Sequence, residues 1–214
     1  SVDVWTNQEL FCLNEAGRPT VVAGVPPDYF STTGQMWGNP LYRWDRMADT
    51  NYDWWTQRFR QALELFDILR IDHFRGFESF WEIPADAENA IAGSWKPGPG
   101  AAPFHAAREA LGGLPIVAED LGLITEEVHH LRDELQFPGM RVIQFGCEHD
   151  DDPYHRPEAY PDHSFAYTGT HDNDSVVGWY RHRHENGERV DIVDRYLSGD
   201  PNRIHLELIS AVLN

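Results

Sequence analysis

Short apolar segments alternate with amphipathic helical patterns along most of the chain, and this alternation is the feature that most restricts its fold. Apolar residues recur at helical spacing over 51–67, 103–111 and 126–135, and another helix is expected from about residue 174. Short apolar runs typical of buried strands occupy 68–72, 114–118, 140–145 and 164–168. Strands that alternate with helices predict an α/β fold with a parallel sheet, either open and doubly wound or closed into a (β/α)8 barrel. No Gly-x-Gly-x-x-Gly follows any of these runs, so the usual dinucleotide-binding signature is missing.

Two stretches, 24–40 and 93–103, are dense in Gly and Pro and also contain aromatic residues. We interpret both as long ordered loops, because Gly and Pro mark turns whereas the aromatic side chains can pack. Long ordered loops in a compact domain are often functional.

Charge and hydropathy exclude several classes of partner. The chain has 35 acidic and 17 basic residues and a net charge of −18, so it is a poor ligand for nucleic acid. It has no run of about 18 apolar residues, which predicts no membrane span. Two cysteines are too few for a disulfide framework and favour a reducing, cytoplasmic location. Because the chain does not start with Met, we expect it to be an internal piece of a longer protein.

Three of the four predicted strands run directly into carboxylates. Asp72 ends the first, Glu119 and Asp120 follow the second, and Asp172 and Asp174 lie just beyond the fourth. Active sites of α/β folds lie at the carboxyl ends of the strands, so these acids are expected at one edge. Asp120 and Asp174 precede a turn or a helix start and are interpreted as turn or capping residues. The remaining three are the candidate functional acids.

Two or three carboxylates in a cleft lined by aromatic rings suit the cleavage of a glycosidic bond. That reaction needs one ionised acid at the anomeric carbon and one protonated acid at the leaving oxygen. Arg70 lies two residues before Asp72, so both side chains point to the same face of a strand, which favours the ionised form of Asp72. Metal binding is the competing interpretation, with His73 and His171 as possible ligands, but no His-x-x-x-His motif lies near these strands.

Six segments together resemble the 4-α-glucanotransferases (amylomaltases, or disproportionating enzymes) of glycoside hydrolase family 77. In order along the chain they are 25–31 (VPPDYFS), 34–42 (GQMWGNPLY), 70–76 (RIDHFRG), 117–122 (VAEDLG), 137–142 (FPGMRV) and 167–174 (YTGTHDND). The first loop and the last segment are highly specific, whereas the strands carrying Asp72 and Glu119 are shared in weaker form with the α-amylase family.

The resemblance implies that residues 1–214 are one segment of a catalytic (β/α)8 TIM barrel, covering its central to C-terminal strands as an incomplete fragment. It implies a retaining double displacement in which Asp72 is the nucleophile, Glu119 the acid/base, and Asp172 the acid that holds sugar hydroxyls. The residues expected to bind substrate are Arg70, His171, Asp28, Tyr29, Phe30, Gln35, Trp37 and Asn173.

The expected substrates are maltooligosaccharides and α-1,4-glucans, with no cofactor and no metal. Two alternatives remain open: an α-amylase-type retaining hydrolase and a non-catalytic glucan-binding fragment. The loop at 34–38 is evidence against the hydrolase. Products formed from maltotriose would discriminate them, since transfer yields longer oligosaccharides and glucose whereas hydrolysis yields new reducing ends.

Overall fold

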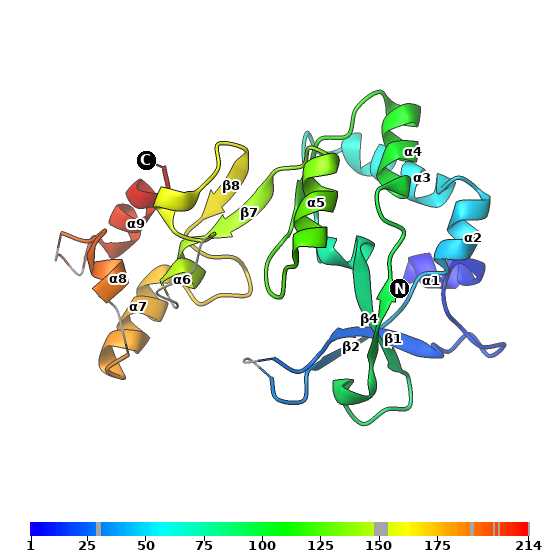
Figure 1. Ribbon diagram of the computed structural model, residues 1–214, viewed down its shortest axis with the longest axis horizontal. Coiled ribbons are helices and arrows are strands. Elements are labelled where there is room, and N and C mark those ends of the chain that lie inside the picture. The colour runs from blue at the N-terminus through cyan, green and yellow to red at the C-terminus, as the bar shows by residue number, and fades with distance from the viewer. Residues whose placement is uncertain (29–30, 148–153, 189–190, 199, 201, 214) are drawn as a thin grey trace. The chain divides into compact units, whose positions relative to one another are not determined.

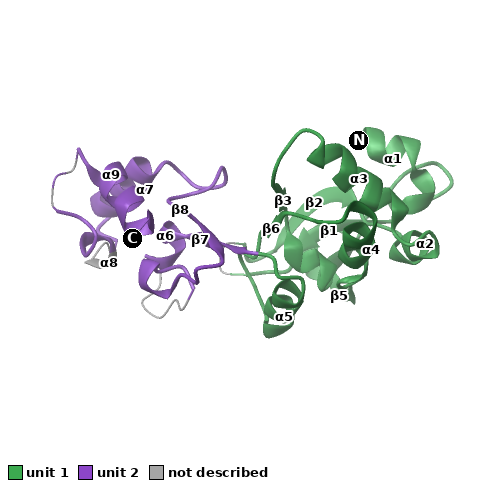
Figure 2. Cartoon of the chain, turned by 90° about the horizontal axis from the view of Figure 1, so that it is seen from above, with its two compact units in different colours: residues 1–137 green, residues 138–214 purple. Residues whose placement is uncertain are grey.

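The fold was analysed in a computed structural model of the chain, which describes residues 1–28, 31–147, 154–188, 191–198, 200 and 202–213 (Figure 1). The chain divides into two compact units, Ser1–Phe137 and Pro138–Asn214 (Figure 2). Each unit has its own strands, helices and hydrophobic cluster, and each is described by itself below. No helix in the described residues is long and apolar enough to cross a membrane.

Unit 1 contains a four-stranded antiparallel sheet in the order β2-β1-β4-β5. Its strands are β1 (Val21–Val25), β2 (Gln35–Pro40), β4 (Ser79–Pro84) and β5 (Ser94–Pro97). Parts of both stretches that the sequence led us to interpret as loops are therefore strands. In the first stretch, Gly24 lies in β1, and a Cβ there would lie 2.1 Å from the Gln35 carbonyl oxygen. Glycine at such a close backbone approach is compatible with a strand.

Unit 1 also contains a parallel pair of short strands, β3 (Leu69–Ile71) and β6 (Ile116–Ala118), with Ile71 opposite Ala118. This pair confirms the parallel pairing expected for the first two apolar runs. The longer helices of the unit also match the predicted patterns: α3 (Asp53–Leu63), α4 (Ala102–Leu111) and α5 (Glu126–Glu134). The shorter ones are α1 (Val2–Thr6), η1 (Gln8–Leu10), α2 (Trp44–Asp49), η2 (Phe74–Phe77) and η3 (Ala90–Ala92).

The core of unit 1 is built largely from aromatic rings. Phe104 of α4 is fully buried, and its ring centroid lies 4.6 Å from that of Phe77 and 5.3 Å from that of Phe137. Phe59 of α3 and Phe74 contact the same ring at 6.0 and 5.9 Å. The segment that follows β3 is thereby fixed against the helices, and with it the residues just beyond the strand end.

Unit 2 contains the second parallel pair, β7 (Gly139–Val142) and β8 (Ser164–Tyr167), in which Val142 lies opposite Tyr167. The helices of this unit are α6 (Ile143–Gly146), η4 (Pro157–Ala159), α7 (Val176–Glu185), α8 (Asp191–Asp194) and α9 (Ile204–Leu213). The sequence predicted one strand over 140–145, but after Val142 the backbone turns into α6 (Figure 1). Ile143 shows why the pattern misled, since it is buried with Trp179 and Leu208 as a helical residue.

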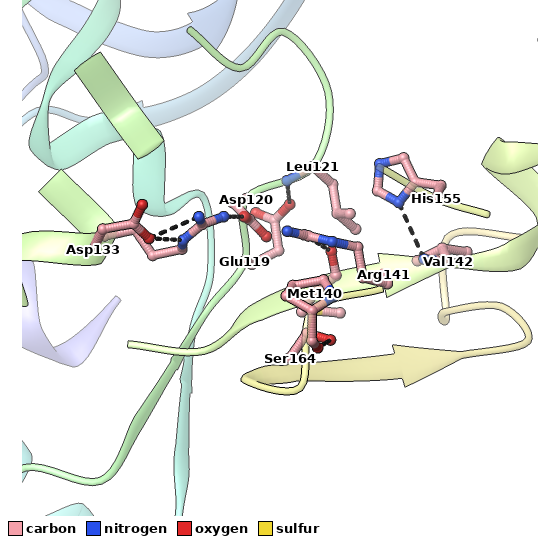
Figure 3. A network of polar contacts seen from close by, with 11 residues as sticks. Glu119, Asp120, Leu121, Asp133, Met140, Arg141, Val142, His155 and Ser164 are labelled. Carbon is pink, nitrogen blue, oxygen red and sulfur yellow. Dashed lines mark hydrogen bonds and ion pairs between the residues drawn. The ribbon is translucent and has the colours of Figure 1, made fainter. Parts of the chain in front are cut away.

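Asp120, interpreted from the sequence as a turn or capping residue, is buried and forms an ion pair. Its Oδ2 lies 2.5 Å from Nη1 of Arg132, which also contacts the exposed Asp133 at 2.8 Å (Figure 3). Asp120→Asn should lower the free energy of unfolding by about 3 kcal/mol, because the largely buried Arg132 guanidinium loses its buried partner and keeps only the exposed Asp133. Asp133→Asn is the matched control and should cost less than about 1 kcal/mol, since that pair is exposed. Equal effects of the two variants in chemical denaturation would contradict this account.

Candidate active site

Two of the predicted acids, Asp72 and Glu119, lie next to one another at the carboxyl ends of β3 and β6. Each acid is the first residue after its strand, and the two strands are paired in parallel. The Glu119 N–H donates to the Ile71 carbonyl at 2.9 Å, and the Phe74 N–H donates to the Glu119 carbonyl at 3.1 Å. The pairing of the strands thus continues through both acidic positions and brings the two residues together.

Backbone donors fix the carboxylate of Glu119. Its Oε2 accepts the His73 N–H at 2.6 Å. Its Oε1 accepts the Leu121 N–H at 3.0 Å (Figure 3). Burial raises the pKa of Glu119, and the negative charge of Asp72 adds to the rise, while the two N–H donors and Arg70 oppose it. A glutamate with a raised pKa is suited to hold and deliver a proton.

Asp72 has the opposite environment. Its side chain is 77% exposed, and its Oδ1 lies 2.7 Å from Nη2 of Arg70. The spacing of two residues along β3 therefore brings the guanidinium and the carboxylate to one face, as the sequence predicted. The two acids therefore differ in their surroundings, as cleavage of a glycosidic bond requires. Asp72 is paired with a cation, whereas Glu119 is partly shielded from water.

His73 connects the acids to an aromatic side chain of β2. Its ring meets that of Trp37 edge to face, with 4.8 Å between centroids and an interplanar angle of 87°. Burial lowers the pKa of His73 to about 4, and the Arg75 charge contributes to the shift while Asp72 opposes it. The imidazole is therefore neutral near pH 7. Sequence reasoning considered His73 only as a metal ligand, and its left-handed backbone (φ 48°) was not detectable.

The loop before β2 is closed by its own polar groups. The Ser31 N–H donates to Asp28 Oδ1 at 2.8 Å, and the Ser31 hydroxyl donates to the Gly34 carbonyl at 2.7 Å. At the start of β2, Gln35 Oε1 accepts the Trp37 indole N–H at 3.2 Å. Asp28 and Gln35 thus have structural contacts besides their expected role in substrate binding. Tyr29 and Phe30, also expected to bind substrate, lie outside the described residues.

A cleft of about 590 Å³ in unit 1 includes Arg70, Asp72 and His73 in its wall. Seven of the other 15 residues that line it are aromatic: Trp37, Tyr42, Trp44, Trp55, Phe77, Phe80 and Trp81. A largely apolar cleft with a few convergent polar groups is the usual form of a small-ligand site. Apart from Trp37, none of these aromatic residues was predicted from the sequence to bind substrate, because aromatic residues that line a cleft and those that fill a core show the same spacing.

The third predicted acid, Asp172, belongs to unit 2, where it follows β8. His171 and Asp172 are both more than 70% exposed, with Nε2 and Oδ2 separated by 3.4 Å. The carboxamide oxygen of Asn173 accepts both the N–H and the hydroxyl of Thr170, at 2.8 and 2.9 Å. Asn173 therefore shapes the loop that carries Asp172, in addition to the substrate contact expected from the sequence.

The described residues offer no group of three or more His, Cys, Asp or Glu side chains placed to hold a metal ion. His73 and His171, the two ligands considered from the sequence, instead contact Trp37 and Asp172 respectively.

An α/β fold that places a partly buried glutamate beside an aspartate at neighbouring strand ends has the pair of carboxyl groups that enzymes acting on glycosidic bonds use. The family model described as 4-alpha-glucanotransferase matches residues 1–214, so the chain belongs to the 4-alpha-glucanotransferase family, glycoside hydrolase family 77.

Individual relatives agree with this assignment. A 4-alpha-glucanotransferase of Thermus thermophilus is 54% identical over 183 residues, which cover 85% of this chain and 37% of the relative. One of Synechocystis is 52% identical over 213 residues, covering 98% and 42%. The structure of the amylomaltase from Streptococcus agalactiae in complex with acarbose superposes with a TM-score of 0.88 at 39% identity, covering 99% of this chain and 43% of that one. The chain thus spans about two fifths of the length of these relatives.

Proposed function

We propose that the protein is a 4-α-glucanotransferase that moves α-1,4-glucan segments between maltooligosaccharide or starch chains by a retaining double displacement. The observation that carries the proposal is the contrast between Glu119, whose pKa is raised by burial, and Asp72, which is paired with Arg70. Membership of the family supports the same reaction. The alternatives, an α-amylase-type hydrolase and a non-catalytic glucan-binding protein, are less well supported by the relatives.

In the first step, a carboxylate oxygen of Asp72 attacks the anomeric carbon as the bond from that carbon to the leaving oxygen breaks. Glu119 gives its proton to that oxygen, so that a shortened glucan leaves and a covalent glycosyl-Asp72 ester remains. In the second step, the 4-hydroxyl of an acceptor sugar attacks the same carbon and loses its proton to Glu119. The ester bond breaks, and Asp72 returns to its ionised form.

Other residues would bind the sugar or exclude water. Asp172 would hold sugar hydroxyls more tightly as the ring distorts, with His171 and Arg70 contributing near the cleaved bond. Trp37 and the loop before it would favour a sugar acceptor over water. In the described structure Trp37 rests on His73, whose backbone N–H binds Glu119. This path of contacts supports a link between acceptor binding and the acid/base.

We further infer that the four parallel strands β3, β6, β7 and β8 are members of a (β/α)8 barrel to which residues 1–214 contribute one segment. A barrel needs eight such strands and typically about 250 residues. The coverage of about two fifths of the relatives is consistent with this interpretation. The low cysteine content remains the basis for proposing a cytoplasmic location.

Incubation of the full-length protein with maltotriose tests the proposed reaction directly. We expect glucose together with maltooligosaccharides longer than the substrate, and no net gain of reducing ends. A steady gain of reducing ends would instead identify a hydrolase. Binding of maltotriose without any product would support the non-catalytic alternative.

The raised pKa of Glu119 predicts the basic limb of the pH–rate profile. Only protonated Glu119 can act in the first step, so kcat/KM should fall as pH rises through a pKa above the ordinary glutamate value of about 4.3. With α-glucosyl fluoride, whose leaving group needs no proton, this basic limb should disappear. The same basic limb on both substrates would assign it to a group other than Glu119.

A further inference from the structure

Gln144 is a buried polar residue whose side chain bridges two points of the main chain of unit 2. It lies in α6, just after β7, and its exposed fraction is 1%. Because β7 and β8 are parallel and paired up to Val142 and Tyr167, α6 begins beside the segment that leaves β8 (Figure 1). That segment carries Asp172.

The amide nitrogen of Gln144 donates to two carbonyl oxygens, one at each end of the acid-bearing loop. The acceptors are Thr168, at 3.0 Å, and Asp174, at 3.2 Å. Both neighbours are acceptors only, which identifies the group facing them as the NH2 of the carboxamide. One side chain thus ties together the two ends of residues 168–174.

Hydrogen bonds within the loop also fix the segment between these two carbonyls. Asn173 accepts two hydrogen bonds from Thr170, and the Asp172 N–H donates to the Thr170 hydroxyl at 3.2 Å. Gly169 allows the loop to approach Gln144, since a Cβ at that position would lie 2.6 Å from the Gln144 amide nitrogen. Hydrogen bonds within the loop therefore hold its middle, whereas Gln144 holds its two ends.

We propose that Gln144 is a positioning residue for glucan transfer: it clamps the loop 168–174 so that Asp172 keeps a fixed place beyond β8. The proposal rests on the proposed function, in which Asp172 binds the sugar most tightly in the transition state. At 1% exposure Gln144 does not contact substrate, so its influence passes through the loop. Loss of the clamp should therefore lower kcat and leave KM nearly unchanged.

Gln144→Met in the full-length protein keeps the side-chain volume but removes both donors. We expect kcat for maltotriose to fall by about 10- to 100-fold, since a displacement of about 1 Å at a reacting group can cost about 100-fold, with KM changed by less than about 3-fold. The variant is then combined with Asp172→Asn in a double-mutant cycle. If Gln144 acts through Asp172, the double variant will be about as slow as Asp172→Asn alone. Effects that multiply would overturn the proposal.

Gly169→Ala tests the clamp from the other side and gives an answer even if Gln144→Met fails to fold. Its Cβ should push the Gln144 amide away and lower kcat in the same way. Gly113→Ala is the matched control, because a Cβ there meets nothing within 4 Å, and it should leave kcat unchanged.

Leu208→Ala, which removes a buried side chain elsewhere in unit 2, controls for lost stability: it should lower the melting temperature but not kcat. A wild type that does not transfer glucan refutes the proposed function, whereas an active wild type with a fully active Gly169→Ala variant refutes the clamp alone.

Discussion

Asp72→Asn should abolish glucan transfer while the protein still binds maltooligosaccharide. The substitution keeps the shape of the side chain but removes the oxygen nucleophile that forms the glycosyl ester, so the first step has no covalent route. We expect kcat to fall by about 10⁴-fold or more, which corresponds to about 5.4 kcal/mol of transition-state stabilisation. Turnover of maltotriose and binding measured by calorimetry together test this expectation.

The chain offers a matched control for the loss of an aspartate that pairs with an arginine. Asp45 lies two residues after Arg43, and Nη2 and Oδ2 of this pair are 2.7 Å apart, the separation found for Arg70 and Asp72. Both aspartates are largely exposed, but Asp45 is not among the residues that line the cleft. Asp45→Asn should therefore keep kcat within about 2-fold of wild type, as expected for an exposed ion pair. A retained kcat in Asp72→Asn would remove Asp72 from the role of nucleophile.

Glu119→Gln should show a defect that depends on the leaving group. Transfer from maltotriose should fall by about 10²- to 10⁴-fold, because the leaving sugar oxygen is no longer protonated. Release of fluoride from α-glucosyl fluoride should be nearly unaffected in the first step, since fluoride leaves without a proton. Comparison of kcat/KM for the two donors is the decisive measurement.

The two donors also control for structural damage in this variant. Glu119 accepts one backbone N–H on each carboxylate oxygen, whereas Gln has a single acceptor oxygen, so one of the two N–H groups loses its partner. The unsatisfied donor should lower stability by about 1–3 kcal/mol. Local disorder would slow both donors alike, whereas loss of the acid slows only maltotriose. Equal losses on both donors would match local disorder rather than the loss of an acid, and would therefore contradict the acid/base assignment.

The sequence was sufficient to predict the acids at the carboxyl ends of the two parallel strands of unit 1. Buried parallel strands are short apolar runs, and an acid directly after such a run must lie at the carboxyl edge of the sheet. This reasoning placed Asp72 and Glu119 correctly, and the pairing of Ile71 with Ala118 brings them together. Arg70 was predictable for the same reason, since residues two apart on a strand share a face.

Contacts made across the fold were not predictable from local patterns. The antiparallel sheet was missed because β2 and β5 are mostly exposed and each ends in a proline, which weakens the strand pattern. Asp120 could not be distinguished from a turn residue, because its partner Arg132 lies 12 positions away on α5. The contacts of Gln144 could not be predicted for a similar reason, since its two acceptors lie 24 and 30 residues further along the chain.

The covalent intermediate on Asp72 is the central claim, and mass spectrometry of the trapped enzyme tests it most directly. In Glu119→Gln, α-glucosyl fluoride should glycosylate the enzyme quickly, while the missing general base slows the attack of the acceptor, so that the ester accumulates. After rapid acid quenching and peptide mapping, we predict one glucosyl group on the peptide that contains Asp72. Turnover of the fluoride with no adduct there, or an adduct on Asp172 instead, would contradict the account.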